Sequence, residues 1–393
     1  MSLSPANPAL YLHVPFCASR CSYCDFHSRV ASAEHYERWF AAVGLHLSAL
    51  DERHGAPSFS SIYIGGGTPS IVPGTMLSAA LARLMPRLAP ADVGAFPEAT
   101  LEANPEDIDE ELLAILADGG LTRLSVGVQS LEDTARRRVQ RRGSATSTRA
   151  GLERIRKRWK GRSSADFIYG LPGQSARGLQ EDLSYAADLG FGHLSLYELT
   201  IAEDSPLGLR IKRGEERLPE PDEAFEHYAA ARELLLSRGY RRYEISNWCL
   251  PGQESAHNLN YWRMGDWLAL GPSASGNLRQ EGGAFLRADN SSDDEAYYAD
   301  PMASVSEYRI EGSDARFEYL MMGLRCAEGV RREAYRSLFG EPIERCFGAV
   351  LSSFPGLIEE DEAGYRPSDR GMDTLNQVLL ACLSAKDAKK ASA

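Results

Sequence analysis

Three cysteines near the N-terminus are the residues with the most definite chemistry. Cys17, Cys21 and Cys24 follow the spacing C-x3-C-x2-C. Three thiolates at this spacing can bind three irons of a cubane iron–sulfur cluster, which leaves the fourth iron open to a second molecule. A zinc site and buried free thiols are the alternatives. Structural zinc takes four ligands, and none of the standard zinc spacings fits, so the pattern favours a cluster.

The rest of the first half alternates between short apolar runs and amphipathic helical stretches. The helical stretches repeat their apolar residues with the period of an α-helix. Six strand–helix units in series predict a parallel sheet with helices outside it. Because the closed barrel of this type has eight strands, we expect an open, partial barrel. The predicted strands are residues 9–14, 61–64, 99–103, 123–128, 165–169 and 193–199.

Polar and glycine-rich motifs follow several of these strands directly. The cysteine loop follows the first strand, Gly65-Gly66-Gly67 follows the second, and Gln129 follows the fourth. Parallel barrels and open α/β sheets build their sites at the carboxyl ends of strands. We therefore expect one site that combines these motifs.

The chain divides into three parts. Residues 1–240 carry the strand–helix units, and residues 241–306 form an irregular connecting segment rich in Gly, Ser and Asp. Beyond it the pattern becomes helical, with a strand–turn–strand at 357–365 before a last helix. This order predicts a small winged-helix-like domain over 307–393. The acidic run 359–362 would repel phosphate, which argues against DNA binding by this domain.

Composition restricts the class of protein and of partner. The 393-residue chain carries 43 Lys and Arg against 55 Asp and Glu, a formal net charge of −12. Such a surface disfavours nonspecific binding to nucleic acid and to anionic membranes. No apolar run is long enough to span a bilayer, and the first ten residues lack the basic and apolar regions of a signal peptide. Seven cysteines, three of them clustered, do not suggest a disulfide framework. We expect a cytoplasmic protein.

The cysteine motif resembles the signature of the radical S-adenosylmethionine (SAM) superfamily. In that superfamily the open iron chelates the amino and carboxylate groups of SAM, and the reduced cluster cleaves SAM to a 5′-deoxyadenosyl radical. Four segments together resemble the oxygen-independent coproporphyrinogen III oxidase family, which includes HemN-type oxidases and HemW-type heme chaperones. This resemblance covers nearly the whole chain and implies a partial barrel, a 4Fe-4S cluster, SAM and an electron donor. The four segments are residues 11–17, 65–69, 166–172 and 243–247.

The resemblance also implies which residues contact SAM. In the family the Gly-rich turn holds the methionine amino group, since glycines let a ligand approach the backbone. One arginine of the run 136–142 can pair with the methionine carboxylate. Its distance from Gln129 selects Arg141, and the other arginines are expected on a solvated face. For the tyrosines, packing over the cluster is an alternative, and the turn can simply join strand to helix. The implied residues are Tyr11, Tyr23, Gly66, Gly67, Thr68, Glu102, Gln129, Arg141 and Asp166.

Two features separate the branches of the family. HemN-type oxidases carry a further cysteine two residues beyond the third, and here that residue is Phe26. The sequence from His257 to Trp262 matches the HNxxYW motif that is associated with heme in HemW-type proteins. A neutral imidazole is a common heme ligand, and Tyr261 and Trp262 can pack on a porphyrin face. The alternative is a loop in which His257 bonds to the backbone and the aromatic residues fill the core.

The chain departs from the HemW pattern at two places. HemW-type proteins often read Gly-Arg-x-His around the SAM-binding arginine, whereas residues 140–143 here read QRRG. They also often have a histidine where Ser275 stands in this chain. Any heme role that these histidines have in relatives is therefore not expected here.

The sequence supports three functional hypotheses. The favoured one is a HemW-type heme chaperone with the cluster and SAM in a structural or regulatory role, heme as its cargo and an apo-hemoprotein as acceptor. The second is a coproporphyrinogen III oxidase that converts propionates to vinyl groups by hydrogen abstraction. The third is another radical SAM enzyme acting on a tetrapyrrole. Phe26 argues against the second, whereas the intact SAM residues leave all enzymatic hypotheses open.

Overall fold

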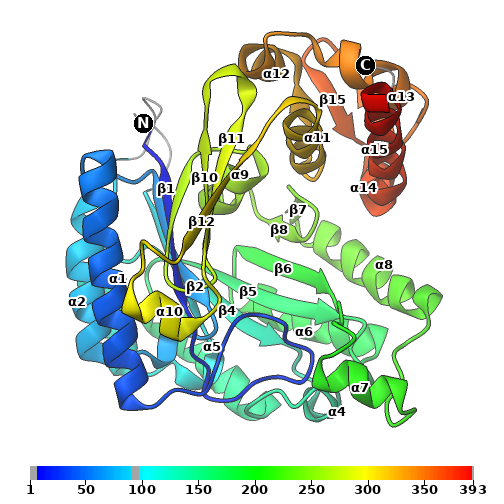
Figure 1. The fold of residues 1–393 in the computed structure, drawn as a ribbon. Helices are drawn as coiled ribbons and strands as arrows, with labels where there is room; N and C mark the ends of the chain where they lie inside the picture. Colours follow the sequence, from blue (N-terminus) through cyan, green and yellow to red (C-terminus); the bar gives the residue numbers. More distant parts are fainter. Residues whose placement is uncertain (1–6, 91–96, 392–393) are drawn as a thin grey trace.

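Six parallel strands in chain order form the centre of the molecule (Figure 1). The computed structural model describes residues 7–90 and 97–391, so six of the first ten residues, which were inspected for a signal peptide, lie outside it. Every strand predicted from the sequence is present, and β5 begins three residues earlier than expected. The strands are β1 (Ala9–Val14), β2 (Ser61–Gly66), β3 (Glu98–Ala103), β4 (Arg123–Gln129), β5 (Arg162–Tyr169) and β6 (His193–Glu198).

Helices cover the outer face of this sheet and bury its apolar side chains. One side chain from each of five neighbouring strands illustrates this burial. Each is at most 1% exposed: Leu12, Ile64, Leu101, Val126 and Phe167. Side chains that point to the same face of a strand recur at every second residue. The α-helices of this region are α1 (Ala33–His54), α2 (Gly74–Leu84), α3 (Glu110–Asp118), α4 (Asp133–Arg138), α5 (Ala145–Arg158), α6 (Ala176–Asp188), α7 (Pro206–Lys212) and α8 (Pro221–Ser237).

The inner face of the same strands is polar. Tyr63, Glu102, Ser125, Asp166 and Ser195 project from five neighbouring strands and line a common cavity. Polar groups of this density are not stable in a dry core without partners. The open barrel therefore has one apolar face that packs on helices and one polar face that forms the wall of a cavity.

Residues 241–306, expected as a connecting segment, extend the sheet at both edges. Strand β8 pairs antiparallel with β6, and β9 pairs parallel with β1. The full order of twelve strands is β12-β11-β10-β9-β1-β2-β3-β4-β5-β6-β8-β7. The added elements are β7 (Arg241–Arg242), β8 (Asn247–Cys249), α9 (Ala256–Trp262), β9 (Trp267–Leu270), β10 (Ser275–Arg279), β11 (Phe285–Asn290), α10 (Asp294–Ala299) and β12 (Val305–Ile310).

The C-terminal part has a hydrophobic core of its own, built around Leu320, Tyr335, Phe347, Ile358 and Val378. Its helices gather at one end of the molecule, orange to red in Figure 1. A three-stranded sheet of order β13-β15-β14 includes the wing expected at 357–365. Within the described residues, no helix is long and apolar enough to cross a membrane. The elements are α11 (Gly312–Gly323), β13 (Val330–Arg331), α12 (Arg332–Phe339), α13 (Ala349–Leu351), β14 (Ile358–Glu360), β15 (Gly364–Pro367), α14 (Asp369–Asp373) and α15 (Leu375–Ala391).

A candidate cluster and cofactor site in the open barrel

The three cysteines of the N-terminal motif face one cavity. Cys17, Cys21 and Cys24 lie in the loop after β1, are half-buried, and carry free thiols. The Thr68 hydroxyl donates to Cys17 Sγ at 3.4 Å, and Arg141 Nη1 donates to Cys21 Sγ at 3.7 Å. Donors of this kind stabilise thiolate ligands and tune the clusters they hold. Three thiols around one cavity, with donors already aimed at two of them, fit a cubane cluster.

Glycine is required at the turn that follows β2. A Cβ on Gly67 would lie 2.5 Å from the backbone oxygen of Phe16, so any side chain there would push the cysteine loop away. Gly66 has a φ of +115°, which L side chains rarely adopt. Its N–H donates to Glu102 Oε2 at 3.0 Å. The turn therefore connects the cysteine loop to the carboxylate at the end of β3.

Glu102 is a carboxyl group held in a low-dielectric setting. It accepts hydrogen bonds from Tyr63 Oη at 2.7 Å and from the Gly66 N–H. Burial raises its pKa to about 7, because removing water disfavours the charged form. A cationic group that binds beside Glu102 would return this pKa towards its ordinary value. The residue is thus suited to recognise an ammonium group.

Arg141 reaches across the end of β4. Its Nη2 donates to Asn104 Oδ1 at 2.6 Å and also contacts the Gly127 carbonyl, while its Nε is buried without a hydrogen-bond partner. Gln129, also in the cavity wall, has a φ of +67° where the β4–β5 register shifts. A buried donor without a partner is costly. A carboxylate in the cavity would satisfy it.

The sequence did not predict that Arg136 is buried beside this site. The arginine run was expected on a solvated face, but Arg136 is only 2% exposed and pairs with Glu106 at 2.8 Å. It also donates to the carbonyls of Val128 at 3.0 Å, Ser130 at 2.9 Å and Arg142 at 2.6 Å. These carbonyls flank Gln129 and follow Arg141, so Arg136 fixes the backbone that presents both side chains.

Asp166 on β5 is surrounded by hydroxyl donors. It accepts from Ser125 at 2.9 Å, Ser164 at 2.9 Å and Ser195 at 2.6 Å. Three donors from three neighbouring strands hold the carboxylate at the cavity wall. The remaining lone pairs are available to sugar hydroxyls.

Eight of the nine predicted SAM residues line one cavity of about 350 Å³. The exception is Tyr11, whose hydroxyl bonds to His13 Nδ1 at 2.9 Å away from the cavity lining. Tyr23 lies in the wall, and burial raises its pKa. The fold therefore brings together residues that are separated by up to about 140 positions in the chain, as carboxyl ends of parallel strands do.

Comparisons with known proteins give the family. The radical SAM superfamily model matches residues 11–186, and the HemN C-terminal domain model matches residues 310–373. The chain is 34% identical to the heme chaperone HemW of Mycobacterium tuberculosis over 70% of each protein. It is 29% identical to HemW of Lactococcus lactis, over 94% of this chain and 95% of that protein. The chain belongs to the HemW group of the radical SAM superfamily.

Two further relatives extend this result. A bovine mitochondrial protein named radical S-adenosyl methionine domain-containing protein 1 is 32% identical, over 96% of this chain and 87% of its own. The structure of coproporphyrinogen III oxidase HemN from Escherichia coli aligns with a TM-score of 0.80 at 21% identity, covering 96% of this chain and 91% of HemN. The HemN likeness establishes the shared fold, a radical SAM barrel with an appended C-terminal domain.

Membership of the radical SAM superfamily implies a 4Fe-4S cluster and SAM as cofactors. The cysteine loop fits the cluster, and the buried Nε of Arg141 together with the carboxyl group of Glu102 fits the two charged ends of an amino acid. In this family setting the third cysteine is followed by Asp25 and then by Phe26, whose side chain is 63% exposed and lines the mouth of the cavity. An apolar ring thus occupies the position of the additional cysteine of HemN-type oxidases.

The histidine of the HNxxYW motif is buried, whereas the rest of the motif is partly exposed. His257 is fully buried, with Nδ1 bonded to Ser61 Oγ and Nε2 to Tyr261 Oη, each at 2.8 Å. Its ring stacks on Tyr63 at 5.0 Å, and burial lowers its pKa to about 4. Trp262 faces the C-terminal part, 6.0 Å from Arg325. In this structure neither imidazole nitrogen of His257 is open to a heme iron, and α9 closes the bottom of the barrel.

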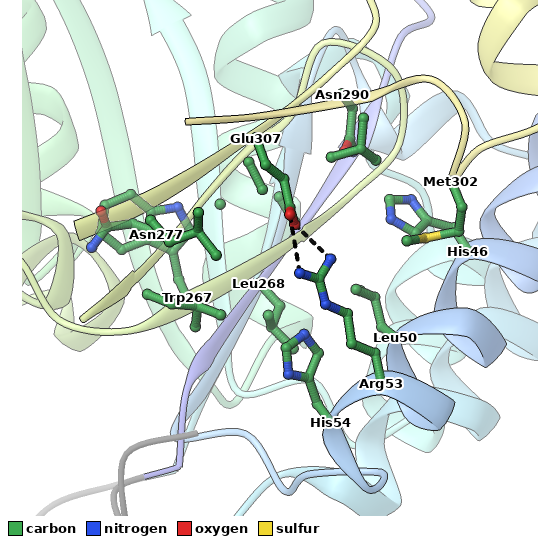
Figure 2. A pocket seen from close by; sticks show the side chains of 16 residues that line it. His46, Leu50, Arg53, His54, Trp267, Leu268, Asn277, Asn290, Met302 and Glu307 are labelled. Atoms are coloured by element: carbon green, nitrogen blue, oxygen red, sulfur yellow. Dashed lines mark hydrogen bonds and ion pairs between the residues drawn. The ribbon is translucent and has the colours of Figure 1, made fainter. Parts of the chain in front are cut away.

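A second hollow lies between α1 and the strands β9 to β12. Figure 2 shows Arg53 and Glu307 paired across it, with Arg53 Nη2 and Glu307 Oε2 3.0 Å apart. The hollow measures about 30 Å³ and has mostly apolar neighbours such as Leu50 and Leu268. A space of this size holds about one water molecule, so it is a packing defect beside an ion pair and not the cofactor site.

Proposed function

We propose that this protein is a heme chaperone that binds heme and delivers it to apo-hemoproteins. The observation that carries the proposal is the match to heme chaperones HemW over nearly the whole chain, including the C-terminal part. The mouth of the cavity supports it, since Phe26 supplies an exposed aromatic surface where the oxidases have a cysteine. Because the seven cysteines are free thiols, we place this activity in the reducing cytoplasm.

The residues of the barrel take separate parts in holding SAM under this proposal. Arg141 and Gln129 bind the methionine carboxylate, Glu102 binds the ammonium, and Asp166 binds the ribose. Cys17, Cys21 and Cys24 bind the cluster, which when reduced supplies an electron that can cleave SAM. Glu102 gives up its proton when the ammonium binds, because the cation favours the ionised carboxylate.

A coproporphyrinogen III oxidase is the second candidate. The observation that favours it is the cavity itself, whose wall contains eight predicted SAM residues in one arrangement. Phe26 stands against it, because an aromatic ring can neither ligate a metal nor donate a hydrogen atom as a thiol can. Conversion of coproporphyrinogen III and delivery of heme are therefore measured on the same preparation.

The test uses the full-length protein with its cluster reconstituted anaerobically. Hemin is added, the Soret band is followed, and the complex is mixed with apomyoglobin as acceptor. The proposal predicts a saturable hemin complex and transfer faster than release into a scavenger of free heme. Hemin that binds without saturation, or that reaches apomyoglobin no faster than the complex releases it into the scavenger, would contradict the proposal.

A further inference from the structure

The loop that carries the three cysteines is closed at its neck by backbone hydrogen bonds. The Cys17 N–H donates to the Arg29 carbonyl at 2.9 Å, and the Arg29 N–H donates to the Pro15 carbonyl at 2.8 Å. Residues 18–28 between them form no helix or strand. Regular secondary structure therefore does not fix the return limb of the loop, residues 25–29, which follows the third cysteine.

A buried carboxylate from a distant part of the chain holds this return limb. Asp294 belongs to α10, and its side chain is 1% exposed. Its Oδ1 accepts from His27 Nε2 at 2.7 Å, and its Oδ2 forms an ion pair with Arg29 Nε at 2.8 Å. The His27 carbonyl also accepts from His13 Nε2 at 2.9 Å, so β1 contacts the same limb. Removing one partner of a buried pair leaves the other charge without compensation, so these contacts resist separation of the limb from α10.

The rest of α10 is attached to the molecule independently of Asp294. Tyr297 Oη lies at hydrogen-bond distance from His46 Nδ1, 2.9 Å. Glu295 accepts two hydrogen bonds of 3.0 and 2.7 Å from Arg38 on α1. Because these contacts already seat α10 on its neighbour, the helix is the support, and the cysteine loop is the part that Asp294 holds.

A cubane cluster needs its three thiolates at fixed separations. Groups that orient metal ligands without touching the metal change how tightly the metal is held. We propose that Asp294 is a positioning residue for the cluster. Through His27 and Arg29 it keeps the return limb, and with it Cys24, in the arrangement that binds iron. This inference depends on the cluster and not on heme delivery, so it holds for a chaperone and for an oxidase alike.

The experiment measures how fast the reconstituted cluster loses iron to the chelator ferrozine under anaerobic conditions. Iron and sulfide are first determined in the wild-type protein. Asp294→Asn keeps the size of the side chain but removes its charge. Iron should leave this variant roughly 10- to 100-fold faster, the range by which such orienting groups change metal affinity. The electron paramagnetic resonance spectrum of the reduced cluster should also change, which a loss of overall stability alone would not cause.

Two substitutions on the same helix are the matched controls. Glu295→Gln removes the exposed ion pair to Arg38, and Tyr297→Phe removes a buried hydrogen bond without touching the loop. Neither should accelerate iron release, and urea unfolding of the apo-protein measures the stability of every variant. Combining Asp294→Asn with His27→Ala should accelerate iron release little beyond the larger single effect, because both substitutions break one contact.

Iron release from Asp294→Asn at the wild-type rate would overturn the proposal. Equal acceleration in Tyr297→Phe would also overturn it, because the effect would then come from loosening α10 as a whole. If Asp294→Asn does not fold, Arg29→Met still decides. It removes one of the two contacts from a side chain that is 38% exposed, and it should release iron faster than Glu295→Gln does. A wild-type protein without cluster iron would instead refute the cluster, and failed heme transfer with an intact cluster would refute the chaperone function alone.

Discussion

Replacing Arg136 with methionine is expected to weaken SAM binding although Arg136 does not line the cavity. The change removes an ion pair to Glu106 and hydrogen bonds to the carbonyls of Val128, Ser130 and Arg142. Removing one partner of a buried pair costs about 3–5 kcal/mol of stability. If the released backbone misplaces only Arg141, the lost charge-assisted contact is worth about 1.5–3 kcal/mol. SAM affinity should then fall roughly 10- to 150-fold.

Equilibrium dialysis with SAM and urea unfolding on the same samples measure both effects. Arg137→Met is the surface control and should change each by less than about 0.5 kcal/mol. Combining Arg136→Met with Arg141→Ala should weaken SAM binding little beyond the larger single effect, because both act on one contact. Full additivity of the two losses, or unchanged SAM affinity in a destabilised Arg136→Met, would refute the positioning role.

Four further outcomes are expected. Replacing Cys17, Cys21 and Cys24 with serine should abolish bound iron and sulfide after anaerobic reconstitution, which colorimetric assays measure. Arg141→Ala should weaken SAM binding by about 1.5–3 kcal/mol, whereas Arg137→Ala should not. Because the folded-state pKa of Glu102 is raised to about 7, its contribution to stability is lost as pH rises through that value. Glu102→Gln should flatten urea-derived stability between about pH 5 and 7 relative to wild type, and a slope that does not change would show that Glu102 titrates normally. His257→Ala should lower the free energy of unfolding by about 1–3 kcal/mol, because two buried hydrogen bonds are lost. The hemin Soret band should not change, and a shifted band would show that His257 ligates the heme iron.

The six central strands could be predicted because their apolar alternation is local information. The run from Ala9 to Val14 and its five successors each satisfy the pattern within one short window. Polar residues that follow strands also predicted the cavity wall, since carboxyl ends of parallel strands always meet at one edge. Long-range pairing is not local information. The run Trp267–Leu270 is apolar throughout, but nothing within it indicates that it pairs with β1.

The sequence also did not predict which charged residues are buried. Arg136 and Arg137 are adjacent and chemically identical, yet only Arg136 meets Glu106 and the carbonyls of Val128, Ser130 and Arg142. Likewise, the sequence did not indicate that the imidazole of His257 bonds to Ser61 and Tyr261, and the heme role of its motif stays a prediction. Partners that lie far apart in the chain decide whether a polar side chain is buried, and a single sequence does not contain that pairing.

Heme delivery and porphyrin turnover, measured side by side, test the central claim most directly. One reconstituted sample is given SAM, a reductant and coproporphyrinogen III, and an equal sample is loaded with hemin and mixed with apomyoglobin. The account predicts rapid formation of holomyoglobin and no loss of propionates from coproporphyrinogen III. Robust formation of the divinyl product without heme transfer would contradict the account and identify an oxidase instead.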